Sequence, residues 1–96
     1  MTKHLTVILK FKEEYTKQAK SLLENLVENS RKENGCLQYD LHQNIENHNV
    51  FILHEVWQNQ DIFDLHNSHH YVKNFFEIVP NLLEEKPTIF FTNKLN

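Results

Sequence analysis

The sequence predicts a single α+β domain in which strands and helices follow the order β-α-β-β-α-β. Four short stretches of alternating or continuous apolar residues are typical of strands, and two longer stretches repeat apolar residues every three or four positions, as amphipathic helices do. The chain has 96 residues, of which 40% are hydrophobic and 24% are charged. We therefore expect residues 1–96 to form one domain around one core.

The first strand and the first helix are predicted between residues 4 and 34. Four apolar side chains alternate along the predicted strand from His4 to Phe11: Leu5, Val7, Leu9 and Phe11. From Glu13 to Asn34, a second apolar set falls on one face of a helix: Tyr15, Ala19, Leu22, Leu23, Leu26 and Val27. Gly35 is the expected C-terminal stop of this helix, because glycine adopts the left-handed conformation freely.

The middle of the chain predicts two strands joined by a polar turn at residues 44–49. In "CLQYDLHQN", the side chains of Leu37, Tyr39 and Leu41 are expected on one face. In "VFILHEVW", residues 50–57, large apolar residues occupy both faces. Such a strand is typically covered on both sides.

The second helical region is predicted over residues 58–85, with apolar residues at largely helical spacing. The Asn67-Ser68 pair is expected to divide it into two helices, since these side chains compete for backbone hydrogen bonds. Pro87 then blocks further helix, and "TIFFTNKL" predicts the last strand. The order is that of a ferredoxin-like antiparallel sheet with its helices on one face. Because the strand at 50–57 is apolar on both sides, we expect a second copy to cover the open face in a homodimer.

Charge and composition argue against several classes of partner. The net charge is -3, and the ten basic residues are scattered, so we expect no nucleic-acid partner. The N-terminal apolar run is too short for a signal sequence or a membrane span, so we expect a cytoplasmic protein without a membrane partner. The single Cys36 is expected to be a small buried hydrophobic residue rather than a reactive thiol.

Three short patterns between residues 33 and 70 resemble the antibiotic biosynthesis monooxygenase family, which includes quinol monooxygenases. They are an E-x-G-C-x-x-Y pattern, an E-x-W pattern, and a histidine followed by a further histidine: Glu33, Gly35, Cys36 and Tyr39; Glu55 and Trp57; His66 with His69 or His70. The patterns occur in the family's order, and the resemblance covers essentially the whole chain.

The resemblance implies a dimeric α+β barrel, in which two sheets face each other and each protomer keeps a pocket between its own sheet and helices. Members of the family oxygenate phenols or hydroquinones without metal or flavin, degrade haem, or isomerise a small signal-breakdown product. We therefore expect no cofactor. In the family, four residues often separate the two histidines, whereas here His69 leaves two and His70 leaves three. Either could take the second role.

The residue types suit oxygenation of a small aromatic substrate. A hydroquinone becomes reactive towards O2 when it loses a proton, which requires a base near neutral pH and a water-poor pocket for the ring. We expect His66 to be the base. The candidate substrate-binding residues supply ring walls or polar donors: Trp57, Phe63, Asn67, His69, His70 and Tyr71. Glu55 is expected to be a supporting, hydrogen-bonded carboxylate, with a second acid-base role as the alternative, and Tyr39 is expected in the core.

A metal site is the main alternative for the histidines. His66, His69 and His70 stand at helical spacing, yet a third ligand would have to come from a distant residue such as His54 or Glu55. We therefore expect no resident metal.

Three other functions stay open at this point. A haem-degrading enzyme would use His70 as axial ligand, although Phe75 and Phe76 crowd that segment. An isomerase or detoxifying enzyme for a polar metabolite would need basic groups, and only Lys73 and Lys86 are near. The third function is a non-catalytic module that binds a small apolar ligand.

Overall fold

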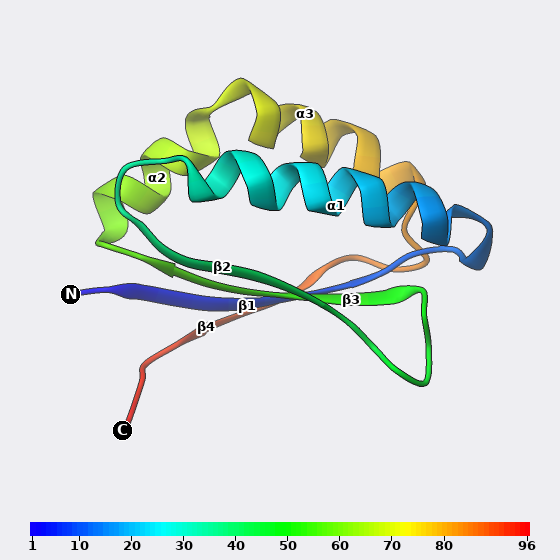
Figure 1. The fold of residues 1–96 in the computed structure, drawn as a ribbon, viewed down its shortest axis with the longest axis horizontal. Coiled ribbons are helices and arrows are strands. Elements are labelled where there is room, and N and C mark those ends of the chain that lie inside the picture. Colours follow the sequence, from blue (N-terminus) through cyan, green and yellow to red (C-terminus); the bar gives the residue numbers. More distant parts are fainter.

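The computed structural model describes residues 1–96 as one antiparallel sheet covered on one face by helices (Figure 1). The strands lie in the order β2-β3-β1-β4 and span Lys3–Lys10 (β1), Cys36–Gln43 (β2), Val50–Trp57 (β3) and Thr88–Thr92 (β4). The helices are α1 (Thr16–Arg31), α2 (Gln60–Ser68) and α3 (His70–Ile78), with short 3-10 helices η1 (Glu13–Tyr15) and η2 (Val79–Asn81). The predicted ferredoxin-like α+β fold is confirmed.

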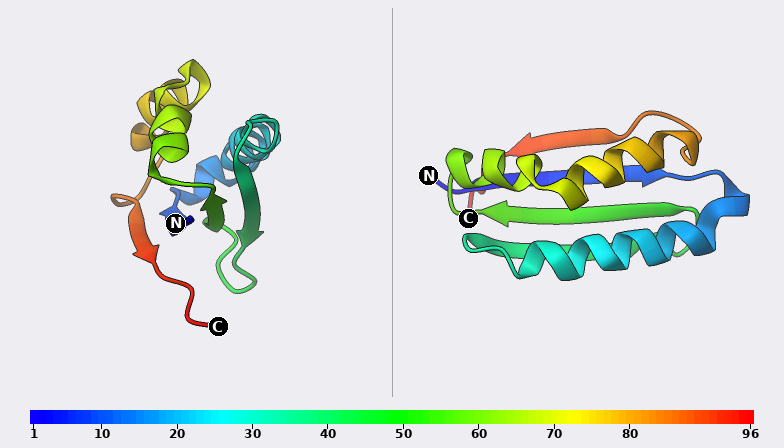
Figure 2. Two further views of the ribbon diagram at one scale, coloured as in Figure 1. Left: turned by 90° about the vertical axis from the view of Figure 1, so that its left-hand side faces the viewer. Right: turned by 90° about the horizontal axis from the view of Figure 1, so that it is seen from above.

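The helices form one layer above the sheet. Seen from above, α1 runs along β2, while α2 and α3 run on the side of β1 and β4 (Figure 2). The side chains of the facing strands alternate as predicted: Leu5, Val7 and Leu9 of β1 are buried beneath the helices. Ala19 and Leu23 of helix α1 have no exposed surface and belong to the same core cluster. The core therefore lies between the sheet and the helix layer.

The expectation that Leu37 shares the core face with Tyr39 is wrong. Strand β2 contains an irregularity in which Cys36 pairs with Trp57 and Gln38 pairs with the next residue of β3, Val56. The extra residue interrupts the period-two alternation, as β-bulges do. Leu37 is consequently exposed, and the half-buried Cys36 packs against the core instead.

The second helical region divides as predicted but ends earlier. Helix α2 stops at Ser68, and His69 takes an extended conformation before α3 begins. The predicted helix to residue 85 is wrong, because α3 ends at Ile78 and Pro80 falls in the 3-10 turn that follows. Proline lacks the amide hydrogen that a helix interior needs. The chain therefore turns before Pro87.

Gly35 has the predicted positive φ of 92° but not the predicted position. Helix α1 ends at Arg31, and Gly35 lies in the turn that leads into β2. A Cβ atom on Gly35 would lie 2.7 Å from Cγ2 of Ile62 in α2. The absence of a side chain thus lets this turn approach α2 closely.

The face of the sheet opposite the helices is partly apolar. Ile8, Ile52, Val56 and Phe90 lie on this open face, where Ile8 pairs with Ile52, Val56 pairs with His4 and Phe90 pairs with Thr6. The first three are half-buried and Phe90 is 53% exposed. Among the helices, none combines the length and the apolar character that crossing a membrane requires.

Candidate active site

A cavity of about 210 Å³ lies between the sheet and the helices. Twelve of its 15 lining residues are hydrophobic, and the other three are Glu55, His66 and Asn67. The most exposed apolar lining residues are Phe76 of α3 and Ile89 and Phe91 of β4. The cavity therefore opens between β4 and the second helical region. Its interior can exclude water from an apolar ligand.

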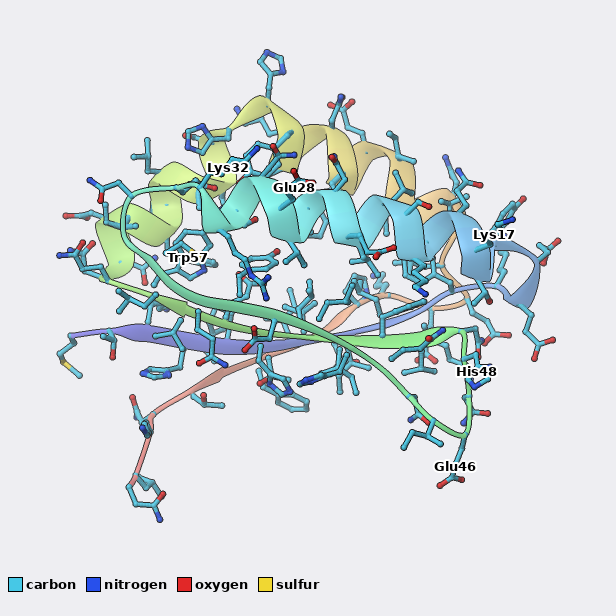
Figure 3. All side chains as sticks on the ribbon, viewed as in Figure 1. Lys17, Glu28, Lys32, Glu46, His48 and Trp57 are labelled. Atoms are coloured by element: carbon cyan, nitrogen blue, oxygen red, sulfur yellow. The ribbon has the colours of Figure 1, made fainter.

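His66 lies in the wall of this cavity, near the C-terminal end of α2, and its side chain is 4% exposed. Its ring centroid lies 4.2 Å from that of Trp57 and 6.4 Å from that of Phe63. Trp57 is fully buried below the helices (Figure 3) and does not line the cavity. Trp57 thus packs against the His66 imidazole without lining the cavity, whereas Phe63 lines the cavity beside the imidazole.

The carboxylate of Glu33 fixes the orientation of the His66 ring. Nδ1 of His66 lies 2.6 Å from Oε2 of Glu33, so Nδ1 carries a proton and donates to the carboxylate. The hydroxyl of Tyr71 donates to the same oxygen and lies 3.3 Å from the hydroxyl of the buried Ser30. Because the Nδ1 proton is donated to Glu33, the nitrogen of a neutral His66 that can accept a proton is Nε2. Nε2 makes no hydrogen bond within the protein.

Burial determines how these groups titrate. Desolvation lowers the pKa of His66, and the hydrogen bond and negative charge of Glu33 oppose this effect. His66 is consequently neutral at pH 7 and able to accept a proton. Burial, with a further contribution from Glu33, raises the pKa of Tyr71, so its hydroxyl remains a donor.

The other two histidines of the segment have different surroundings. Nε2 of His69 lies 3.2 Å from Oε1 of Glu33, and its ring stacks on Tyr71 with centroids 5.9 Å apart. His70 is exposed, its side chain makes no hydrogen bond or ion pair, and it lies outside the cavity lining. Between the two histidines, the geometry therefore favours His69 as the second member of the site. No group of three or more His, Cys, Asp or Glu residues is arranged to hold a metal ion.

Glu55 is a second ionisable group of the cavity. It is buried, and its Oε1 accepts a hydrogen bond of 3.0 Å from the indole nitrogen of Trp57. Burial raises the pKa of Glu55 to about 7, against the effects of the Trp57 hydrogen bond and the nearby Tyr39 hydroxyl. The carboxyl group can therefore hold or release a proton near neutral pH.

Comparisons with known proteins agree with the fold. A family model described as antibiotic biosynthesis monooxygenase matches residues 4–78. The chain belongs to the antibiotic biosynthesis monooxygenase family. The resemblance in the sequence is thereby confirmed.

Two relatives are each 31% identical to this chain over the residues that align. One is the uncharacterized protein sll1783 of Synechocystis, aligned over 84% of this chain and 55% of its own length. This chain therefore spans little more than half of that relative. The other, named "Putative monooxygenase YcnE", is from Bacillus subtilis and aligns over 74% of this chain and 75% of its own length. Among solved structures, Rv0793 from Mycobacterium tuberculosis superposes with a TM-score of 0.93 at 19% identity, over 100% of this chain and 97% of that one.

The structure brings only part of the predicted site together. Phe63, His66, Asn67 and Glu55 line the cavity, whereas the other predicted residues lie behind or beside it: Trp57, His69, His70 and Tyr71. Tyr39, expected in the core, is buried and also lines the cavity. Glu33 was given no role from the sequence, although it begins the first of the three family patterns. The E-x-G-C-x-x-Y pattern could therefore have identified Glu33 as a site residue from the sequence.

Proposed function

We propose that this protein is a cofactor-independent monooxygenase that oxidises a small, quinol-like aromatic compound with O2. The observation that carries the proposal is the imidazole of His66, which lies in the wall of an apolar cavity with its Nδ1 held by Glu33. Membership of the antibiotic biosynthesis monooxygenase family supports the reaction type.

The cavity suits a single substituted ring. Its volume of about 210 Å³ is below the about 300–1,000 Å³ common for drug-sized ligands. Aromatic side chains at Tyr39, Phe63 and Phe91 offer faces or edges to such a ring. Asn67 can donate a hydrogen bond to a substrate oxygen at the more exposed end, and Glu55 can do so from the interior when protonated.

The proposed reaction begins when Nε2 of His66 accepts the proton of a phenolic hydroxyl. The electron-rich anion then transfers electrons to O2, one oxygen atom enters the ring, and the other leaves as water. For hydroquinone and O2, the balanced products are hydroxybenzoquinone and water, and the quinol supplies all four electrons. His66 is the catalytic base in this scheme.

The surroundings disfavour two of the other functions. No Lys or Arg lines the cavity, which argues against a phosphorylated or strongly anionic substrate. His70 lies outside the cavity, so the histidine considered as a haem ligand is not placed to reach a group inside it. A module that only binds a small apolar ligand remains the principal competitor, because it requires the same apolar lining.

A homodimer completes the proposal. Ile8, Ile52, Val56 and Phe90 leave apolar surface on the open face of the sheet, and a second copy of the same sheet would cover it. Sedimentation velocity at micromolar concentration should give the mass of two chains. A stable monomer at that concentration contradicts this part of the proposal.

The enzymatic part is tested by O2 uptake with a panel of substituted hydroquinones. His66→Ala should lower kcat by about 10²–10⁴-fold, the usual contribution of a positioned general base. His70→Ala is the matched control and should retain wild-type turnover, since His70 contacts neither the cavity nor Glu33. Binding of the quinols without O2 uptake by the wild type would instead identify a binding module.

A further inference from the structure

Three side chains form a continuous chain of contacts from the cavity to the surface. Nδ1 of His66 lies 2.6 Å from one oxygen of Glu33, and Nε2 of His69 lies 3.2 Å from the other. The exposed fractions of the three side chains rise in the same order, from 4% for His66 to 12% for Glu33 and 41% for His69. Only the last of them has substantial access to bulk water.

A base inside an apolar cavity must release each proton that it accepts before it can act again. Within the cavity, Glu55 and Asn67 are the other polar side chains, and a bound ring would separate His66 from the opening. On the Nδ1 side, the carboxylate of Glu33 is in direct contact. The route through Glu33 therefore stays available while the cavity is occupied.

We infer that Glu33 and His69 form a proton-exit route from His66 to solvent, which rests on the proposed role of His66 as base. When Nε2 of His66 takes a proton from the substrate, Nδ1 passes its own proton to Oε2 of Glu33. A half-turn of the carboxyl group brings that proton to His69, which accepts it at Nε2. His69 then releases one proton to water, which leaves His66 protonated at Nε2 alone. When Nε2 gives that proton to the reduced oxygen, the same route returns a proton from water to Nδ1, so each group regains its starting state and the net reaction releases no proton.

The neighbouring groups leave His69 as the acceptor at the outer end. Burial raises the pKa of the Cys36 thiol to about 11, with Glu33 adding to the effect. The pKa of Tyr71 is raised as well, first by burial and then by its hydrogen bond to Glu33. Both groups therefore keep their protons at neutral pH. Tyr71 instead positions the route, because its hydroxyl binds Glu33 and its ring stacks on His69.

His70 provides a matched control for His69. The two histidines are adjacent, and both are accessible enough to be replaced without opening the core. His69 lies against Glu33, whereas the side chain of His70 has no hydrogen bond or ion pair. Replacing either histidine by Gln makes the same chemical change in the same segment. Only the change at His69 removes the contact with Glu33 that the route needs.

The test that does not depend on turnover is NMR measurement of solvent exchange of the His66 Nδ1 proton. We expect exchange to slow at least about tenfold in His69→Gln and to remain at the wild-type rate in His70→Gln. Equal exchange rates in the wild type and in His69→Gln would overturn the inference, whether or not the protein oxidises a quinol.

The second readout is O2 uptake with a quinol that the wild type oxidises, in dilute buffer of low proton-carrying capacity. We expect His69→Gln to lower kcat about tenfold with little change in KM, and added imidazole to restore the rate. A loss that imidazole does not restore overturns the proton-exit role, because a purely structural defect gives that result. If the wild type oxidises none of the quinols, the proposed function fails, while the exchange measurement still decides the route.

Discussion

Glu33, in the turn between α1 and β2, and Glu55, in β3, are the two carboxylates of the candidate site, and their surroundings differ. Glu33 accepts hydrogen bonds from His66 and Tyr71 and lies beside His69. Glu55 lines the cavity and accepts a hydrogen bond from the indole of Trp57, with the hydroxyl of Tyr39 nearby. One carboxylate holds other functional groups in place, and the other faces the space where a ligand would bind.

The difference shows how the number of donors affects a buried acid. A carboxylate surrounded by several donors makes strong, directional hydrogen bonds and can orient an imidazole. A carboxylate with few donors pays the cost of desolvation in its charged form, which raises the pKa of Glu55 to about 7. Replacing Glu33 is therefore expected to affect catalysis, whereas replacing Glu55 is expected to affect the pH dependence of stability.

The largest effect is expected from Glu55→Gln on the pH dependence of unfolding. The pKa of Glu55 is raised from 4.5 to about 7, so its contribution to stability is full below pH 4.5 and is lost as the pH rises through 7. The shift corresponds to a loss of about 3 kcal/mol in the free energy of unfolding of the wild type between low and high pH. The Gln side chain of the variant carries no charge at either pH, so the variant does not undergo this loss. Urea unfolding at pH 4 and pH 8 should therefore show the variant gaining up to that amount relative to the wild type.

An exposed carboxylate serves as the control for this measurement. Glu24→Gln on α1 should follow the wild type at both pH values. A difference between the wild type and Glu55→Gln that is the same at pH 4 and pH 8 would contradict the contrast between the two carboxylates.

A somewhat smaller effect is expected from Glu33→Gln on activity. Loss of an orienting partner typically costs about 10–100-fold, and the amide cannot hold the Nδ1 tautomer of His66 as strongly. Because Glu33 raises the pKa of His66, its replacement should also move the acidic limb of the kcat/KM profile to lower pH. The measurement is a pH-rate profile with any quinol that is turned over.

Glu28→Gln is the matched control for Glu33→Gln. Glu28 stands on the exposed face of α1 (Figure 3), where it lies 3.8 Å from Lys32. This variant should keep both the rate and the profile of the wild type. An acidic limb that stays in place in Glu33→Gln would show that Glu33 does not tune His66.

The smallest effect is expected at Gly35, which lies in the turn that carries Glu33. An alanine at its φ of 92° should cost about 1–2 kcal/mol, in addition to the close approach to Ile62. Urea unfolding of Gly35→Ala, Ile62→Ala and the double variant gives the coupling between the two positions. The double variant should be destabilised by at least about 0.5 kcal/mol less than the sum of the single variants. Strict additivity would mean that the turn does not depend on its approach to α2.

Much of the fold follows from local patterns in the sequence. The alternation of Leu5, Val7 and Leu9 reflects the pleat of one strand, and the break after Ser68 reflects local hydrogen-bond competition. The exposed Leu37 was mispredicted, because a bulge depends on how β2 pairs with β3 rather than on β2 alone. The end of α3 at Ile78 could have been predicted from Pro80, which has a local effect.

The site was predicted less completely because its contacts are long-range. His66 and Phe63 could be proposed from residue type and resemblance. The partner of His66 is Glu33, which is 33 residues away and comes within 2.6 Å only when the turn at Gly35 packs on α2. The distinction between His69 and His70 likewise depends on the extended residue between two helices, which directs one imidazole towards Glu33.

The central claim, that Glu33 holds His66 as a neutral base with Nε2 free, is tested most directly by ¹⁵N NMR titration of the His66 side chain. We expect the neutral ring to be protonated at Nδ1 and its pKa to lie below the ordinary 6.5. A neutral ring protonated at Nε2, or a pKa above 6.5, would contradict this account of the site.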